Sequence, residues 1–417
     1  MARSRSLAVV SVALVACTHV HTFGSAPHSL SPSKREPPSK QARSSASDPR
    51  RPASAASPIR TELASVVLGV SRDQRTALLV VGGYPGFQQP GRYRRVDIST
   101  GDTVEEFAGG SLPGLPVAGY VTDAERARWV APATLGSDLA RVGAVWAGLA
   151  DTRHHRFAAS ALGVVFGVGD ALYASDARGE RVAPLSRSAA YAPRFSPDGT
   201  LVAWGEYIGR REEGIYALHV ANIADRRPRR VAGSEHVDYE GHRFSRDGRT
   251  LYFTAYDEAR RSHCFRAASV DRDGAVTAAR SVFCGADRKD NVELTISPSG
   301  TTALVSVRHR TEGSAGTIDL HWIRLSDQRE LARHTRSGVF GMGSVMDDGL
   351  VVASVAGDTA LIDPVSRTQT TLSWMRLAPR HYSLAWRSAD ELVASTREGL
   401  RVIRPRQLFN SAQATPW

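Results

Sequence analysis

The chain has 417 residues, a formal net charge of +11 and 42% hydrophobic residues, which excludes a wholly disordered protein. Residues 1–60 hold nine basic and two acidic residues, so most of the positive charge lies at the start of the chain. Only three of the 53 basic residues are lysines, and no basic face with interleaved aromatic residues is visible. We therefore expect no nucleic-acid partner.

Residues 1–17 are predicted to be a lipoprotein signal peptide. Arg3 and Arg5 precede the uncharged residues 7–16, a run too short to cross a bilayer. The sequence Leu14-Val15-Ala16-Cys17 resembles the bacterial lipoprotein signal, in which the cysteine carries the lipid. An ordinary signal peptide with an incidental cysteine is the alternative. Thr18, in place of an aspartate, favours the outer over the inner membrane by the same resemblance.

Residues 18–58 are rich in proline, serine and alanine, with Phe23 as their one aromatic residue. Such a segment cannot bury enough apolar surface to offset its ordering entropy. We expect a disordered tether between the membrane and a folded body.

The folded part is organised around a repeated strand, turn and strand. Its clearest copy is Phe195-Ser196-Pro197-Asp198-Gly199, followed by the apolar residues 201–204, and it returns at residues 243–253 and 294–301. Proline, aspartate and glycine each favour a tight turn for a different steric or hydrogen-bonding reason. The turn glycines Gly199, Gly248, Gly300 and Gly349 are 49, 52 and 49 residues apart. Units of this length with four short strands are typical of β-propeller blades.

The Phe-Ser-Pro-Asp-Gly turn with its apolar second strand resembles the WD40-like, TolB-type (PD40) propeller repeat. The resemblance spans roughly residues 61–405, and it is closest at residues 192–204 and 241–253. It implies an all-β propeller with a central channel. It implies no catalytic residues, because the repeat motif is structural in that family.

Counting first strands predicts eight four-stranded blades in a propeller domain of residues 59–407. The candidates are residues 65–71, 116–121, 155–160, 192–196, 242–245, 293–297, 343–347 and 382–387. No turn motif anchors residues 113–188, so one long blade with an insertion, and seven blades in all, is the alternative. Residues 60–63 are expected to complete the last blade, and residues 408–417 to form a polar tail.

Cys264 and Cys284 flank a predicted hairpin whose turn is centred on Asp273 and Gly274. This places the two cysteines within about one residue of cross-strand register, near bonding distance. Because an exported protein folds in an oxidising compartment, we predict a disulfide, with two buried thiols as the alternative.

The densest polar run is His236, Asp238, Glu240 and His242. On a strand, alternation would place all four side chains on one face, where they could hold a metal or another ligand at the channel mouth. A solvated loop entering a blade is the alternative that we favour, so we predict no metal and no cofactor. The sequence also contains no Gly-x-Ser-x-Gly nucleophile motif.

Together these features predict an exported, lipid-anchored propeller in the bacterial cell envelope. We expect it to bind an envelope protein, to contact the membrane through its lipid, and to have no enzymatic activity. The alternative is a propeller enzyme of the lyase or hydrolase type with a polar or metal site at the channel mouth. Convergence of His236, Asp238, Glu240 and His242 with groups of other blades would favour the enzyme.

Overall fold

The computed structural model describes residues 66–81, 92–107, 135–149, 156–168, 171–186, 188–209, 215–237, 241–286, 291–309, 316–337, 343–355, 358–377, 384–396 and 399–417. The predicted signal peptide with Cys17, the tether of residues 18–58 and the candidate strand at residues 60–63 lie outside this part of the chain. Within it, no helix is both long enough and apolar enough to cross a membrane.

The described strands form seven antiparallel sheets, numbered here as blades in chain order. Blade 1 consists of β1 (Val66–Val70), β2 (Thr76–Val81), β3 (Arg92–Asp97) and β4 (Thr103–Phe107). Blade 2 consists of β5 (Phe157–Ala159), β6 (Gly163–Val168), β7 (Ala171–Asp176) and β8 (Ala183–Pro184). Blade 3 consists of β9 (Ala190–Phe195), β10 (Leu201–Tyr207), β11 (Tyr216–Asn222) and β12 (Arg229–Arg230). Blade 4 consists of β13 (Arg243–Phe244), β14 (Thr250–Asp257), β15 (Ser262–Ser269) and β16 (Arg280–Cys284).

The remaining blades complete the propeller. Blade 5 consists of β17 (Asn291–Ile296), β18 (Thr302–Arg308), β19 (Thr317–Arg324) and β20 (Arg329–Ser337). Blade 6 consists of β21 (Ser344–Val345), β22 (Val351–Val355), β23 (Asp358–Asp363), β24 (Thr368–Leu372) and β28 (Thr415–Pro416). Blade 7 has the described strands β25 (Leu384–Trp386), β26 (Leu392–Thr396) and β27 (Gly399–Ile403). The two helices of the described residues are α2 (Leu135–Ala147) and α3 (Pro405–Ser411).

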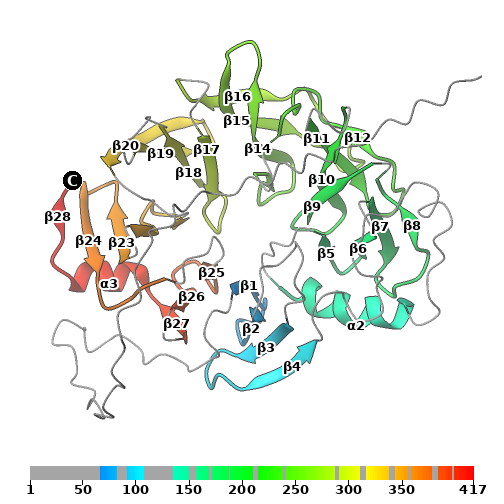
Figure 1. The fold of residues 1–417 in the computed structure, drawn as a ribbon, viewed down its shortest axis with the longest axis horizontal. Coiled ribbons are helices and arrows are strands. Elements are labelled where there is room, and N and C mark those ends of the chain that lie inside the picture. The colour runs from blue at the N-terminus through cyan, green and yellow to red at the C-terminus, as the bar shows by residue number, and fades with distance from the viewer. Residues whose placement is uncertain are drawn as a thin grey trace, which may run out of the picture. The chain divides into compact units, whose positions relative to one another are not determined.

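The blades follow one another around a common centre (Figure 1). The first strand of each blade lies towards the centre, as β1, β5, β9 and β25 show, and the last strand lies at the periphery, as β4, β8 and β16 show. The all-β propeller that the repeated turn predicts is confirmed.

The turn between the first two strands of a blade is fixed by its own side chains. The Ser196 hydroxyl donates a hydrogen bond to Asp198 Oδ1 (2.6 Å), while Ser196 Oγ accepts one from the Leu201 N–H (2.9 Å). Gly199 has a φ of +76°, which a glycine adopts without steric cost. Burial opposes ionisation of Asp198, but hydrogen bonds from Ser196 and Thr200 lower the pKa of its carboxyl group. This local chemistry sets the strand register without help from the rest of the chain.

The same serine and aspartate pattern closes other turns. In blade 1, Ser71 donates to Asp73, and in blade 4, Ser245 donates to Asp247 (2.6 Å) and accepts from the Thr250 N–H. The turn therefore recurs because the same serine and aspartate hydrogen bonds form in each of these blades.

The core lies between the blades. Trp204 of blade 3 is fully buried against blade 2, together with Val165 and Leu172. On the opposite face of blade 3, Leu218 packs with Phe253 of blade 4. Each sheet thus buries both faces, and burying a large apolar side chain contributes about 1.5–3 kcal/mol. Apolar packing between neighbouring blades therefore stabilises the ring.

The expected count of eight blades is wrong, and the alternative of seven holds. Residues 116–121, the predicted first strand of an extra blade, lie outside the described residues. Between β4 and β5 the structure instead contains α2, whose Leu139, Val142 and Trp146 pack against Phe157 and Val164 of blade 2. Their spacing is helical, with side chains three and four residues apart on one face.

Residues 405–417, of which 408–417 were expected to form a polar tail, pack on the propeller. Arg406 of α3 forms ion pairs with Asp348 (2.6 Å) and Asp363 (2.8 Å), and β28 adds to the outer edge of β24. The Trp417 ring stacks on Trp322, with centroids 6.3 Å apart. This segment covers the edge of blade 6, which would otherwise expose unpaired backbone groups.

Candidate functional site

The candidate site lies on the innermost strands of blades 3 and 4. In every described blade, a backbone N–H donates a hydrogen bond that closes the turn after the first strand. The residue two positions before this donor occupies an equivalent place on each first strand. We call these seven places the layer positions, and they hold Gly69, Ala158, Arg194, Arg243, Thr295, Ser344 and Ala385.

At two of the layer positions the side chain contacts the following blade. Thr295 of blade 5 donates from its hydroxyl to the Gly343 carbonyl ahead of blade 6 (3.2 Å). Ala385 of blade 7 packs with the first-blade residues Val67 and Val70. Arg194 and Arg243 occupy equivalent positions of the repeat on the first strands of neighbouring blades.

An irregularity in blade 3 shapes the chain beside Arg194. The register between β9 and β10 shifts between Ala203 and Gly205, and Ala192 has a φ of +50°, a left-handed conformation that is uncommon for alanine. A side chain on Gly205 would collide with the Tyr191 ring, 2.5 Å from the added Cβ. Bulges of this kind often redirect side chains next to functional sites.

His242 fills the space next to this irregularity. The side chain is fully buried beside the backbone of Ala192 and Ala203. Burial lowers the pKa of His242 well below its usual value, and the guanidinium groups of Arg194 and Arg243 lower it further. Backbone groups of Ala203 and Ala192 act in the opposite direction but do not outweigh burial. The lowered pKa favours the neutral imidazole at pH 7.

The four residues of the predicted polar run are not all brought together. Asp238 and Glu240 lie outside the described residues. His236 is at the surface, with Nε2 3.3 Å from Glu258 Oε1, whereas His242 is buried between blades 3 and 4. Among the described residues, no group of three or more histidine, cysteine, aspartate or glutamate side chains could hold a metal.

Backbone pairing explains why the two histidines separate. Val237 forms a β-bridge with Ala255 of β14, and the Gly241 carbonyl accepts a hydrogen bond from the N–H of Thr254, which precedes Ala255 in β14. Val237 and Gly241 are four residues apart, but their partners in β14 are adjacent. The one-for-one alternation assumed for a regular strand does not apply here.

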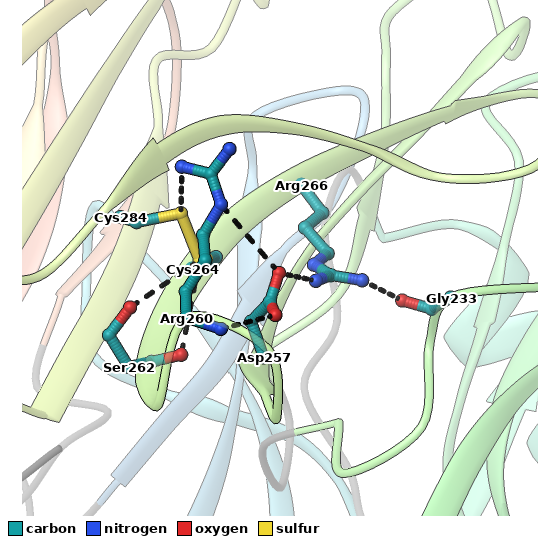
Figure 2. A network of polar contacts seen from close by, with 7 residues as sticks. All are labelled: Gly233, Asp257, Arg260, Ser262, Cys264, Arg266 and Cys284. Atoms are coloured by element: carbon teal, nitrogen blue, oxygen red, sulfur yellow. Dashed lines mark hydrogen bonds and ion pairs between the residues drawn. A yellow bond between two sulfur atoms is a disulfide. The ribbon is translucent and has the colours of Figure 1, made fainter.

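Cys264 and Cys284 occupy directly paired positions on β15 and β16 and are joined by a disulfide, with their Cα atoms 4.0 Å apart. Cys264 is fully buried, and Arg260 places a guanidinium nitrogen 3.7 Å from Cys284 Sγ (Figure 2). The bond ties the outer edge strand of blade 4 to the strand beside it.

Side chains near this disulfide in blade 4 also contact the segment that precedes His242. Asp257 pairs with Arg266, which also donates to the Gly233 carbonyl (2.5 Å), as Figure 2 shows. Burial opposes ionisation of Asp257, but the backbone N–H of Arg260 and the charge of Arg266 lower the pKa of its carboxyl group. Gly233 belongs to the connection between blades 3 and 4, so this network positions the segment that carries His236 and His242.

Sequence reasoning missed Arg194 and Arg243, although the signal for them was present. Both stand immediately before Phe-Ser in the two clearest copies of the repeat, so they occupy the same repeat position on neighbouring blades. Treating the repeat as purely structural overlooks the residues in which its copies differ.

Comparison with known proteins changes the functional interpretation. No family model matches the chain. Two curated proteins named dipeptidyl-peptidase 5, from Trichophyton schoenleinii and Arthroderma benhamiae, are each 35% identical over 83 residues, 19% of this chain. The matched part covers 11% of each relative, so the chain matches only about a tenth of their length.

Several solved structures are similar to this chain at low sequence identity. A puromycin hydrolase is 16% identical with a TM-score of 0.48, and the match covers 81% of this chain and 50% of the hydrolase. The β-propeller domain of the Trilobed protease from Pyrococcus furiosus is 12% identical with a TM-score of 0.41, covering 63% of this chain and 82% of that domain. The expectation that the chain is not an enzyme is contradicted, because the curated proteins that it resembles in sequence are named as peptidases.

Proposed function

We propose that this chain is a propeller enzyme of the hydrolase type that acts on peptides. The observation that carries the proposal is the 35% identity over 83 residues to dipeptidyl-peptidase 5 proteins. The low-identity structural neighbours add only that the fold is a propeller.

The layer positions of blades 3 and 4 are the proposed binding groups for the peptide. Arg194 and Arg243 stand on the first strands of neighbouring blades. Guanidinium groups donate hydrogen bonds in a planar fork that fits peptide oxygens and carboxylates. His242 lies close enough to both arginines for their charges to lower its pKa.

A hydrolysis assay on the purified full chain tests the proposal. A panel of aminoacyl and dipeptidyl p-nitroanilides is incubated with the protein, and release of p-nitroaniline is followed by absorbance. We expect release from dipeptidyl substrates and a slower rate for Arg243→Gln. The matched control is Arg249→Gln, an exposed arginine of the same blade.

Two outcomes would overturn the proposal. One is no release from any peptide substrate by a correctly folded protein. The other is equal loss of rate in Arg249→Gln and Arg243→Gln. The same preparation incubated with uronate oligosaccharides distinguishes the lyase alternative, since a lyase would produce an unsaturated, ultraviolet-absorbing product.

We also propose that the protein is exported and lipid-anchored in a cell envelope through Cys17. Support comes from the sequence Leu14-Val15-Ala16-Cys17 and the uncharged run before it. Labelling with a palmitate analogue in a bacterial host tests this proposal. Label in the native protein and in Cys17→Ser alike would contradict it.

A further inference from the structure

We propose that β20, the outer strand of blade 5, is a docking edge that pairs with an extended, acidic peptide segment of another protein. Figure 1 places β20, drawn in yellow, at the outer end of its blade. The proposal does not rest on the proposed function, because Arg194 and Arg243 stand on the first strands of other blades.

The outer side of β20 has no partner strand within the described part of the chain. The strand order of blade 5 is β17-β18-β19-β20, so β19 pairs with one side of β20 only. Among the described residues, the backbone groups of residues 330–337 make hydrogen bonds with β19 alone. A row of unpaired N–H and C=O groups is a template on which an extended peptide can add a further strand.

β20 is also much longer than the outer strands of the other blades. It has nine residues, whereas β8 and β12 have two each, and β4, β16, β24 and β27 have five each. Part of the outer edge of β24 is covered by β28. Short or covered edge strands resist pairing with other chains. The length of β20 therefore makes blade 5 the blade best suited to accept another strand.

One row of β20 side chains is exposed and held in place. The alternate residues 329, 331, 333, 335 and 337 are exposed, while 332, 334 and 336 are partly buried. Leu331, in the middle of the exposed row, is 49% exposed. Arg333 forms an ion pair with the buried carboxylate of Asp319, and the Thr335 hydroxyl donates a hydrogen bond to it (2.5 Å). A facing side chain would therefore meet an apolar surface between fixed polar groups.

The edge carries an excess of positive charge. β20 has three arginines and one acidic residue. Neither Arg329 nor Arg336 has a carboxylate partner among the described residues, and Arg336 donates to the amide oxygen of Gln369 (3.1 Å). Arg280 of blade 4 likewise donates to an amide oxygen, that of Gln328, next to Arg329 in the chain. An acidic segment fits this edge, whereas a second copy of β20 would bring like charges together.

The alternation of a strand defines the pattern of the partner. Side chains that face Arg329, Leu331 and Arg333 lie on one side of the added strand, at every second residue. Opposite charges that face each other across two strands are favourable, and like charges are unfavourable. We therefore expect a segment with an acidic, an apolar and an acidic residue at alternate positions.

Isothermal titration calorimetry on the full chain at low ionic strength measures the binding. The acidic probe is the peptide acetyl-Thr-Glu-Thr-Val-Thr-Glu-Thr-amide, and the comparison peptide has lysine in place of both glutamates. We expect the acidic peptide to bind at least about tenfold more tightly, because two favourable charge pairs replace two unfavourable ones.

Methylation of the peptide backbone tests strand pairing itself. Two further versions of the acidic peptide carry N-methyl groups on alternate amides, one version on the odd residues and the other on the even residues. Alternate residues of a strand direct their N–H groups to opposite edges, so only one version should lose its binding.

Variants locate the binding on β20. Leu331→Ser should weaken binding of the acidic peptide about three- to tenfold, and Leu162→Ser, at a leucine that is 50% exposed in blade 2, should leave it unchanged. Arg329→Glu should weaken the acidic peptide and strengthen the lysine peptide, while Arg249→Glu, at an exposed turn of blade 4, should do neither. The acidic peptide should also slow hydrogen exchange of residues 329–337 in the native protein.

Equal binding of the acidic and lysine peptides, equal loss with both N-methylated versions, or no binding of any peptide would overturn the inference. Slower exchange confined to the first strands of blades 3 and 4 would do the same. A dimer in light scattering that Leu331→Ser dissociates, without peptide binding, would assign the edge to a second copy and overturn the choice of an acidic peptide. Peptide hydrolysis without binding at β20 would leave the proposed function standing.

Discussion

Acid should destabilise this protein through His242. Burial, together with the charges of Arg194 and Arg243, lowers the pKa of this side chain well below 6.5 in the folded state. In the unfolded chain the imidazole titrates near 6.5. Below that pH the unfolded state therefore binds a proton that the folded state does not, and stability falls as the pH falls. The stabilising contribution is complete above pH 6.5.

The size of the effect follows from the proton difference. With one more proton in the unfolded state, the free energy of unfolding drops by about 1.4 kcal/mol per pH unit. Each pH unit below 6.5 that still lies above the lowered pKa of folded His242 should therefore cost up to about 1.4 kcal/mol. This is a large fraction of the stability of a typical domain.

The assay is urea unfolding, followed by tryptophan fluorescence, at several pH values between 7.5 and 5, on the native protein and on His242→Gln. The variant is expected to lose the pH slope that His242 contributes, whatever its stability at pH 7.5. The difference between the two curves is the measured quantity, since it cancels the other titrating groups. If the two proteins show parallel pH profiles, the neutral, buried state of His242 is refuted.

Three further outcomes are expected. Gly199→Ala should destabilise the protein by about 2–3 kcal/mol in urea unfolding, because φ is +76° and the new Cβ would lie 2.7 Å from a side-chain carbon of blade 2. Gly248→Ala should cost only about 1 kcal/mol, because the atom nearest to its new Cβ is 3.5 Å away. The reverse order of the two variants would contradict the turn packing. Replacing Cys264 and Cys284 together by serine should lower stability by about 3 kcal/mol and abolish its dependence on reductant, and a variant still sensitive to reductant would be inconsistent with the pairing. His334→Gln should reduce the acid sensitivity in the same direction as His242→Gln, since burial lowers the pKa of His334 to about 4; an increase in acid sensitivity would exclude this assignment.

The fold was predictable wherever local chemistry dictates it. The hydrogen bonds of Ser196 and Asp198 involve residues within five positions of each other, so the sequence alone indicates the hairpin. The same is true of Ser245 and Asp247. Because each blade repeats this unit, a propeller follows from the recurrence.

The blade count failed where that chemistry is missing. Residues 113–188 contain no turn motif, and the sequence analysis predicts only strands in this region. Yet Leu139, Val142 and Trp146 are spaced for a helix and pack on blade 2. Whether such a segment is a strand or a helix depends on the tertiary surface that it meets, which the local sequence does not specify.

The candidate site was hidden for a related reason. The residues that the copies of the repeat share form the turns and strands of the blades. Arg194 and Arg243 instead occupy a place at which the other described blades carry small, uncharged residues. In a ring of equivalent strands, binding at one side of the axis requires the copies to differ there. The positions that break the repeat, rather than those that define it, are therefore where binding groups should be sought in this fold.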